Sequence, residues 1–272
     1  MRWQRGYESS DVEDRRGQRA PMRLGGVPAL SGGGLVAVLV IYLIARALGV
    51  TGGGGGGDTT QPAMTSADER ELYQFVSFVF DDVQKSWEDQ FRRLGKPYRH
   101  AKLVVFTDAV DSACGITGSE VGPFYCPRDQ KAYIDLSFYS LLRDKLGAGG
   151  DFAQAYVLAH EMGHHVQNLL GENERNGSRD NETSVRMELQ ADCLAGVWAH
   201  STDQRKLLEA GDIEESMNAA EQIGDDRLQR RGGGRVNPET FTHGTSEQRQ
   251  RWFKRGLNEG DPRACDTFRG DI

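Results

Sequence analysis

The spacing of apolar residues along the chain predicts mostly helices. Over residues 66–94, apolar side chains recur every three or four positions, which is typical of a long helix with one buried face. Residues 151–170 lack proline and are followed by Gly171, a common residue just after a helix. Further helices are predicted over residues 137–146, about 183–200, in two segments within 203–230, and after the capping pattern Thr245-x-x-Gln248.

Two short stretches are typical of β-strands. Residues 102–106 are a mainly apolar run, and residues 131–136 alternate between polar and apolar. Residues 113–127 are rich in glycine and are predicted to form a loop, as are the charged residues 172–183. We therefore predict an α+β fold that is mainly helical and contains a small β-sheet.

The first part of the chain has a different pattern. Residues 1–30 are polar and mixed in charge, and we expect no fold there. Residues 31–50 contain a long apolar run in which Arg46 is the one charged residue. Because a bilayer span needs about 20 apolar residues, this segment predicts a transmembrane helix. A signal peptide and an internal core helix are the alternatives. The long polar leader argues against a signal peptide, and the flanking glycines argue against a core helix. Residues 51–65 are glycine-rich and predict a flexible linker.

Charge asymmetry around the apolar run predicts its orientation. Basic residues outnumber acidic ones in residues 1–30, which favours a cytoplasmic N-terminus for a single-pass anchor. The folded domain, residues 66–272, would then be periplasmic or extracellular. The net charge of −7 and pI of about 5.5 make nucleic acid an unexpected partner.

The four cysteines form no C-x-x-C pair, which excludes a cysteine-rich zinc ribbon. An oxidising compartment would allow them to form disulfides, whereas reduced, buried cysteines are the alternative. Four cysteines allow three pairings. Closeness in sequence favours Cys114 with Cys126, which leaves Cys193 with Cys265.

The predicted helix over residues 151–170 contains the pattern H-E-x-x-H. Positions i and i+4 share one face of a helix, so His160 and His164 can direct their imidazoles at one metal ion. Glu161 lies about 100° further round the helix and can flank that ion as a general base. Gly163 between the histidines would allow another backbone to pass close by. Because a pattern this short also occurs by chance, it requires a third ligand.

The next predicted helix contains Glu188 and Asp192, which are also i and i+4. Two histidines and a glutamate with an open fourth position form a catalytic zinc set, in which Glu188 would be the third ligand. Asp192 would accept the free ring N–H of a ligand histidine. Solvated surface carboxylates are the alternative. Val185, Leu189 and Trp198 indicate a buried helix instead, and buried carboxylates need a partner such as a metal.

The remaining histidines lie outside the predicted ligand set. His243 precedes the last helix and could bind the oxyanion of a tetrahedral intermediate, although a structural loop histidine is the alternative. His165 is expected to point away from the metal face, and His100 and His200 to lie at the surface.

The H-E-x-x-H helix followed by an E-x-x-x-D helix resembles the gluzincin zinc peptidases, of which thermolysin is a member. Longer strings resemble the bacterial family called putative neutral zinc metallopeptidases, whose members carry an N-terminal membrane anchor and a Gly-rich linker. The resemblance covers most of residues 66–270. Its strings are CGITGSEVGPFYCPRDQKAYIDLSFY, LAHEMGHHVQNLLG, ELQADCLAGVWA, FTHGTSEQRQRWFKRG and DPRACDTF.

The resemblance implies one zinc ion held by His160, His164 and Glu188, with Glu161 as catalytic base and Asp192 beside a ligand. It also implies a zincin-like domain that acts on peptides.

The F-T-H setting of His243, ahead of a capped helix and Arg249, is similar to that of a transition-state histidine in CAAX-type membrane proteases.

The predicted function is a membrane-anchored zinc metallopeptidase with a peptide or protein substrate. The strand over 131–136 is either an edge strand that pairs with that peptide or an ordinary packed strand. One alternative function is a zinc amidase acting on cell-wall or other amides. Another is a non-catalytic peptide-binding or chaperone-like module with a structural zinc, which would have no use for Glu161 beside an open coordination position.

Overall fold

The computed structural model describes residues 1–18, 66–175, 180–233 and 235–272. The strands are β1 (Val12–Asp14), β2 (Lys102–Phe106), β3 (Ala109–Ser112), β4 (Gly115–Gly118), β5 (Phe124–Cys126) and β6 (Lys131–Asp135). The helices are α2 (Ser66–Arg93), α3 (Ser137–Asp144), α4 (Asp151–Leu170), α5 (Glu172–Arg175), α6 (Asn181–Gln204), α7 (Asp212–Gln222), α8 (Asp225–Arg231) and α9 (Ser246–Glu259). Short 3-10 turns cover Ser119–Val121, Pro238–Thr240 and Pro262–Cys265. This composition confirms the mainly helical α+β class.

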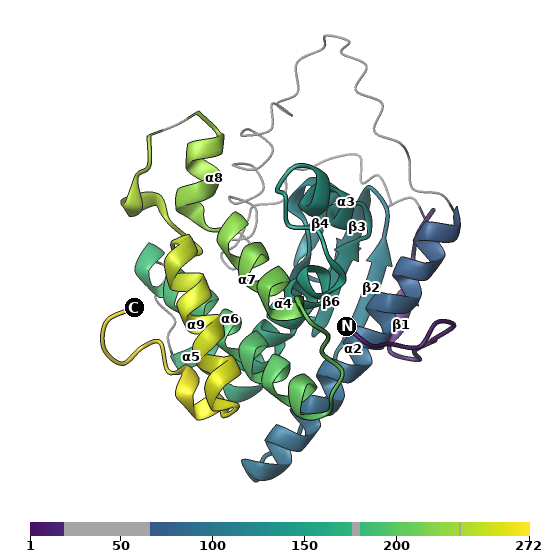
Figure 1. The fold of residues 1–272 in the computed structure, drawn as a ribbon, viewed down its shortest axis with the longest axis horizontal. Coiled ribbons are helices and arrows are strands. Elements are labelled where there is room, and N and C mark those ends of the chain that lie inside the picture. Colours follow the sequence, from purple (N-terminus) through teal and green to yellow (C-terminus); the bar gives the residue numbers. More distant parts are fainter. Residues whose placement is uncertain (19–65, 176–179, 234) are drawn as a thin grey trace.

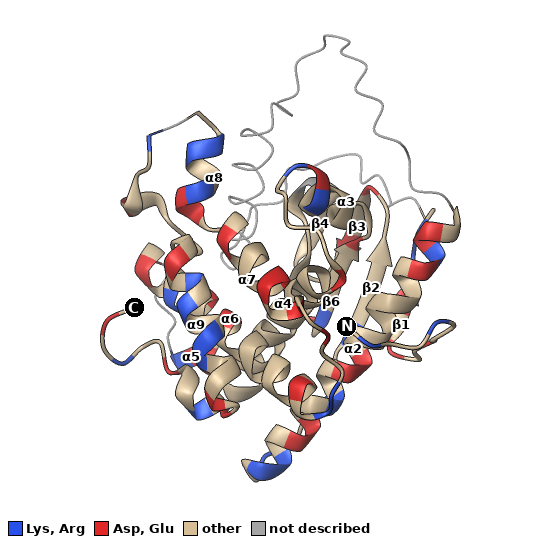
Figure 2. Cartoon of the chain, in the orientation of Figure 1, with Lys and Arg blue, Asp and Glu red and all other residues tan. Residues whose placement is uncertain are grey.

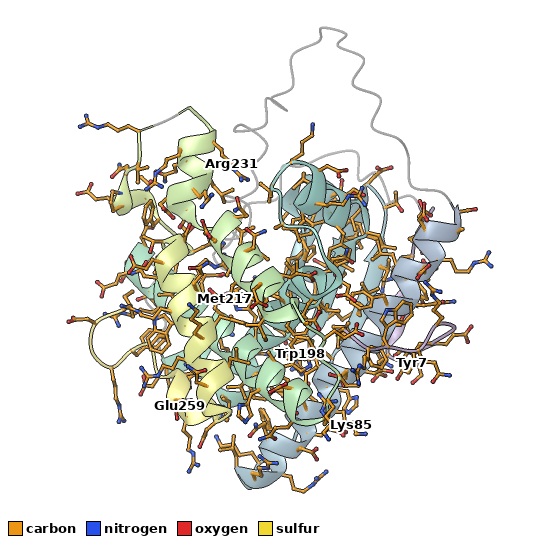
Figure 3. The ribbon with its side chains drawn as sticks, in the orientation of Figure 1. Tyr7, Lys85, Trp198, Met217, Arg231 and Glu259 are labelled. Atoms are coloured by element: carbon orange, nitrogen blue, oxygen red, sulfur yellow. A yellow bond between two sulfur atoms is a disulfide. The ribbon has the colours of Figure 1, made fainter. Side chains whose placement is uncertain are left out.

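Helix α4 lies in the middle of the fold. In Figure 1 the main sheet and α2 lie on one side of α4, and α6, α7 and α9 lie on the other. Trp198 of α6 reaches the interior of this arrangement (Figure 3), where its ring stacks on Phe152 of α4 with centroids 5.3 Å apart. Its ring N–H donates to Asp82 of α2 at 2.8 Å. One buried tryptophan therefore links the three longest helices.

The main sheet has four strands in the order β1-β2-β6-β5. Strands β1, β2 and β6 run parallel, and β5 is antiparallel to β6. Successive side chains of a strand point to opposite faces. Leu103 and Val105 accordingly join the large helical core, whereas Val104 and Phe106 join a smaller cluster on the other face. Burial of both faces explains the uninterrupted apolar run in β2.

Two strand predictions need correction. The predicted loop over 113–127 contains β4 and β5. Both strands are too short to show a strand period, and β4 also begins and ends with glycine. The strand predicted over 131–136 is β6, which pairs with β2 on one side and β5 on the other. It is therefore not an edge strand, and β5 is the strand at that edge of the sheet, in contact with α4.

The prediction that residues 1–30 have no fold is wrong for residues 1–18. Strand β1 pairs in parallel with β2, in the register Val12 to Leu103. The signal is missing from the sequence because three residues are too few for a period, and the partner strand is remote in the chain. The predicted anchor over 31–50 and linker over 51–65 lie outside the described residues. Within the described ranges, no helix is long and apolar enough to cross a bilayer.

Each of the two disulfides joins different structural elements. The structure pairs Cys114 with Cys126, which fastens the hairpin β3–β4 to β5, and Cys193 with Cys265, which fastens α6 to the C-terminal segment. These are the pairs that closeness in sequence favoured. Lysine, arginine and acidic residues are interspersed on the outer helices α2, α8 and α9 (Figure 2).

Candidate metal centre

Helix α4 carries both histidines of the H-E-x-x-H pattern into the interior. The helix begins at Asp151, and Gly150 occupies the N-cap position, one residue before the position that a capping Asp151 would have given. It ends at Leu170, and the following residue, Gly171, has a φ of 75°, which is left-handed and suits glycine. The rings of His160 and His164 lie on one face, 4.9 Å apart between centroids. This places two imidazoles side by side toward α6.

A glycine sets how closely α6 approaches that face. A Cβ at Gly163 would lie 3.0 Å from both the Cα and the carbonyl oxygen of Ala191, so an alanine there would press against the backbone of α6. Ala191 lies between Glu188 and Asp192 in the sequence. The close helix contact therefore brings these two carboxylates onto the two histidines, which explains why the pattern contains glycine.

The three predicted ligands converge. Ligand atoms of His160, His164 and Glu188 all lie within 4.8 Å of one another. The Nε2 atom of His160 is 3.1 Å from Glu188 Oε2, and the Nε2 atom of His164 is 3.5 Å from Glu188 Oε1. Burial alone would raise the pKa of Glu188, but the neighbouring histidines, His243 foremost, hold that pKa well below its usual value.

The opposite ring nitrogen of each ligand histidine is already engaged. His160 Nδ1 lies 2.8 Å from Asp192 Oδ1, and His164 Nδ1 lies 2.8 Å from Gln167 Oε1. Because both partners are acceptors, each Nδ1 donates a ring proton to its partner, so the tautomer that a bound metal would select has its lone pair on Nε2, on the side of Glu188. This is the tautomer that a metal-ligating histidine requires. The residues present therefore fit a divalent metal of the zinc type.

Asp192 is fully buried and accepts four hydrogen bonds. Besides His160, its donors are the Tyr156 hydroxyl at 2.6 Å and the Arg249 guanidinium at 2.8 and 2.9 Å. Arg249, itself 2% exposed, supplies the charge that neutralises this carboxylate. Sequence reasoning assigned Asp192 but not Tyr156 or the role of Arg249. The sequence signal that could have indicated Arg249 is a carboxylate in an apolar helix, because a buried carboxylate needs a cation from another part of the chain.

Glu161 follows His160 and borders the ligand group. Burial raises the pKa of its carboxyl, and the positive fields of His164 and His160 oppose that rise. None of the described residues forms a hydrogen bond or ion pair with this carboxylate. Glu161 is thus an unengaged carboxyl whose pKa is moved toward neutrality, a suitable state for a group that accepts a proton.

His243 reaches the same group from the loop before α9. Its Nε2 lies 3.9 Å from Glu188 Oε2, and the Thr242 hydroxyl contacts its Nδ1 at 2.7 Å. The loop is fastened by Asp225, at 2% exposure, whose Oδ2 accepts the backbone N–H groups of Thr242, His243 and Gly244 at 2.7, 2.6 and 3.1 Å. A single carboxylate that accepts three amides holds this loop rigidly. No spacing in the sequence pointed to Asp225.

His165 has a structural role, as its predicted direction suggested. Its Nε2 meets the carbonyl of Arg99 at 2.7 Å and its Nδ1 meets the Tyr125 hydroxyl at 2.9 Å. Burial lowers its pKa to about 4, so it stays neutral. Since Tyr125 belongs to β5, this histidine fixes the edge strand against the metal helix.

Comparison with known proteins agrees with this geometry. Residues 1–268 match the model of the family described as "Putative neutral zinc metallopeptidase". The chain belongs to this family.

Relatives in this metallopeptidase family extend over most of the chain. The "Uncharacterized protein YpfJ" of Escherichia coli K12 is 49% identical over 98% of this chain and 99% of its own length. The "Uncharacterized protein Rv2575" of Mycobacterium tuberculosis H37Rv is 43% identical over 75% of this chain and 73% of its own. No solved structure is a significant match to the chain.

Proposed function

We propose that this chain is a zinc-dependent peptidase whose metal is held by His160, His164 and Glu188. The observation that carries the proposal is the convergence of the ligand atoms of two histidines and a carboxylate, with both Nδ1 atoms held by acceptors behind them. Glu161 lies beside the three ligand residues but is not one of them. A set of three protein ligands is typical of catalytic rather than structural zinc. When bound, zinc supplies a Lewis acid that polarises a carbonyl group and makes water more acidic.

Side chains around the ligands provide proton transfer, oxyanion stabilisation and orientation of a ligand ring. Glu161 accepts a proton from the attacking water and delivers it to the leaving nitrogen, and its raised pKa makes the return transfer easier. The Thr242 hydroxyl lies 2.7 Å from His243 Nδ1, and when it donates to that nitrogen, Nε2 carries the ring proton and faces the site as a donor. That N–H can stabilise an oxyanion formed from the substrate carbonyl. Asp192 and Arg249 keep the His160 ring in its orientation.

Metal content tests the ligand set directly. Full-length protein, prepared without chelators or a metal-affinity tag, should contain about one zinc per chain by mass spectrometry, and Glu188→Gln should lose most of it, since catalytic zinc needs three protein ligands. Glu182→Gln is a matched control on the same helix, because its side chain is 72% exposed and lies away from the ligands. Zinc retained at wild-type affinity in Glu188→Gln would show that Glu188 is not a ligand.

A second prediction concerns Asp225. In Asp225→Asn, the three backbone N–H groups lose their shared charged acceptor, and charge-assisted hydrogen bonds of this kind contribute about 1.5–3 kcal/mol each. The loop should loosen, so that kcat falls by about tenfold or more while zinc content and KM change little. Turnover of a quenched-fluorescent peptide and zinc content would be measured together, with exposed Asp203→Asn as control. Unchanged kcat would mean that the position of His243 does not matter for turnover.

A further inference from the structure

Residues 1–18 bind the domain through a continuous set of polar contacts. The Leu103 amide donates to the Asp11 carbonyl at 2.9 Å, and the Arg15 amide donates to the Val105 carbonyl at 2.7 Å. Asp11 pairs with Lys102 at 2.7 Å, and Glu13 pairs with Lys131 at 2.6 Å. Asp11, just before β1, and Glu13 within it therefore face the lysines that begin β2 and β6, so the charges of the two parts are complementary.

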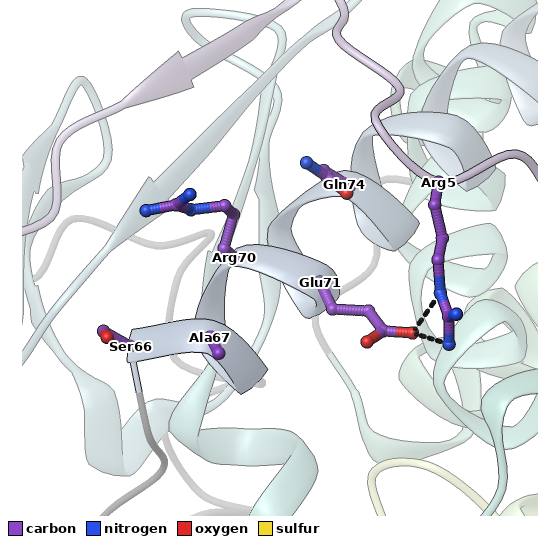
Figure 4. Close-up of a pocket in the computed structure, with 6 residues that line it drawn as sticks. All are labelled: Arg5, Ser66, Ala67, Arg70, Glu71 and Gln74. Carbon is purple, nitrogen blue, oxygen red and sulfur yellow. Dashed lines mark hydrogen bonds and ion pairs between the residues drawn. The ribbon is translucent and has the colours of Figure 1, made fainter.

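The contacts continue along α2. Asp81 accepts hydrogen bonds from the Tyr7 hydroxyl at 2.9 Å and from the Ser9 hydroxyl at 2.7 Å. Near the start of α2, the Arg5 guanidinium lies 2.7 Å from Glu71 and closes one side of a shallow surface hollow (Figure 4). Tyr7 can be followed beside α2 in Figure 3.

Apolar contacts reinforce this attachment. The rings of Trp3 and Phe75 lie 5.5 Å apart, and those of Tyr7 and Phe78 lie 5.4 Å apart, both edge to face. Met1 is 4% exposed within the large core. Its amino group lies 2.7 Å from Asp151, the first residue of α4, so the segment also touches the helix that carries the metal ligands.

These contacts have a topological consequence. Paired strands lie about 4.8 Å apart, whereas the hydrocarbon core of a bilayer is about 30 Å thick. Strand β1 cannot pair with β2 across a membrane. The orientation predicted from the sequence places residues 1–30 in the cytoplasm and residues 66–272 outside, and that separation is incompatible with the contacts of residues 1–18.

We infer that residues 1–18 are an integral part of the peptidase domain and occupy the same side of the membrane as the metal centre. The family match supports this, because it begins at residue 1. Both disulfides lie in the domain, and disulfides persist in oxidising compartments, so the shared side is the oxidising one. The inference does not depend on peptidase activity.

Thiol labelling of the full-length protein in cells tests this inference. All four cysteines of the sequence are paired, so an introduced cysteine is the only free thiol. Arg5→Cys reports on the N-terminal segment and Arg269→Cys on the domain, at side chains that are 79% and 90% exposed. A membrane-impermeant maleimide is added to spheroplasts, and again after the membrane is permeabilised.

Labelling of both variants in intact spheroplasts is the expected result. Labelling of Arg269→Cys alone, with Arg5→Cys reacting only after permeabilisation, would overturn the inference and restore the orientation predicted from the sequence. If both variants react only after permeabilisation, residues 1–18 and the domain do lie on the same side of the membrane. The assignment of that side to the oxidising compartment would then be wrong. Arg263→Cys, at a side chain that is 79% exposed, repeats the domain measurement at an independent position.

Discussion

Glu161→Gln should reduce kcat by about two to four orders of magnitude, the usual contribution of a general base, while the protein keeps its zinc. Glutamine has nearly the same shape as glutamate but cannot accept a proton. The three convergent ligand residues are unchanged in this variant, so the metal remains. The effect should fall on kcat rather than KM, because proton transfer belongs to the transition state.

The measurement compares wild type and variant on fluorogenic casein and on a mixed library of quenched-fluorescent peptides, with zinc content determined on the same samples. Glu174→Gln is a suitable control, because Glu174 is exposed on a short helix away from the ligands. Wild-type turnover by a zinc-loaded Glu161→Gln variant would rule out Glu161 as the base. Loss of zinc in the same variant would show that Glu161 helps to hold the metal.

The candidate site residues were predictable from the sequence where they recur at helical spacing. His160 with His164, and Glu188 with Asp192, are i and i+4 pairs, so each pair shares a helix face whatever the rest of the fold does. Gly163 indicated a close backbone approach, and Ala191 provides it. The long helices were predictable for the same reason, since each buries a face with a regular spacing.

The contacts that hold the site together were not predictable in this way. Arg249 binds Asp192 although the two residues are 57 positions apart in the sequence. Asp225 accepts the backbone N–H of His243 from 18 positions away. No local period encodes such pairs, because they depend on how the helices pack. Strand β1 was missed for the same reason, since its three residues gain strand character only from pairing with β2. These long-range partners are brought into place only by the tertiary structure. The sequence indicates that such a partner exists only where a charged residue lies in an otherwise apolar helix.

The second large effect is expected at Arg249, which makes two hydrogen bonds to the fully buried Asp192. Arg249→Met keeps much of the side-chain volume but leaves the carboxylate without its cation. Breaking a buried ion pair in this way costs about 3–5 kcal/mol. In a domain of this size, each kcal/mol of lost stability lowers Tm by about 2–4 °C. The Tm of Arg249→Met should therefore lie roughly 6–20 °C below that of the wild type. Zinc affinity should also fall by about 10–100-fold, because Asp192 orients His160.

Two further variants show whether the loss arises from the unpaired charge. Arg263→Met removes an exposed arginine that pairs with Asp261, and Tm should be nearly unchanged because solvent already screens that pair. Asp192→Leu combined with Arg249→Met removes both buried charges, so its Tm should lie above that of Arg249→Met alone. The same double variant should still bind zinc weakly, since His160 then lacks the acceptor at Nδ1. A Tm for Arg249→Met equal to that of Arg263→Met would mean that Arg249 does not neutralise Asp192. Stability and metal affinity would then depend on Tyr156 and the remaining contacts of Asp192.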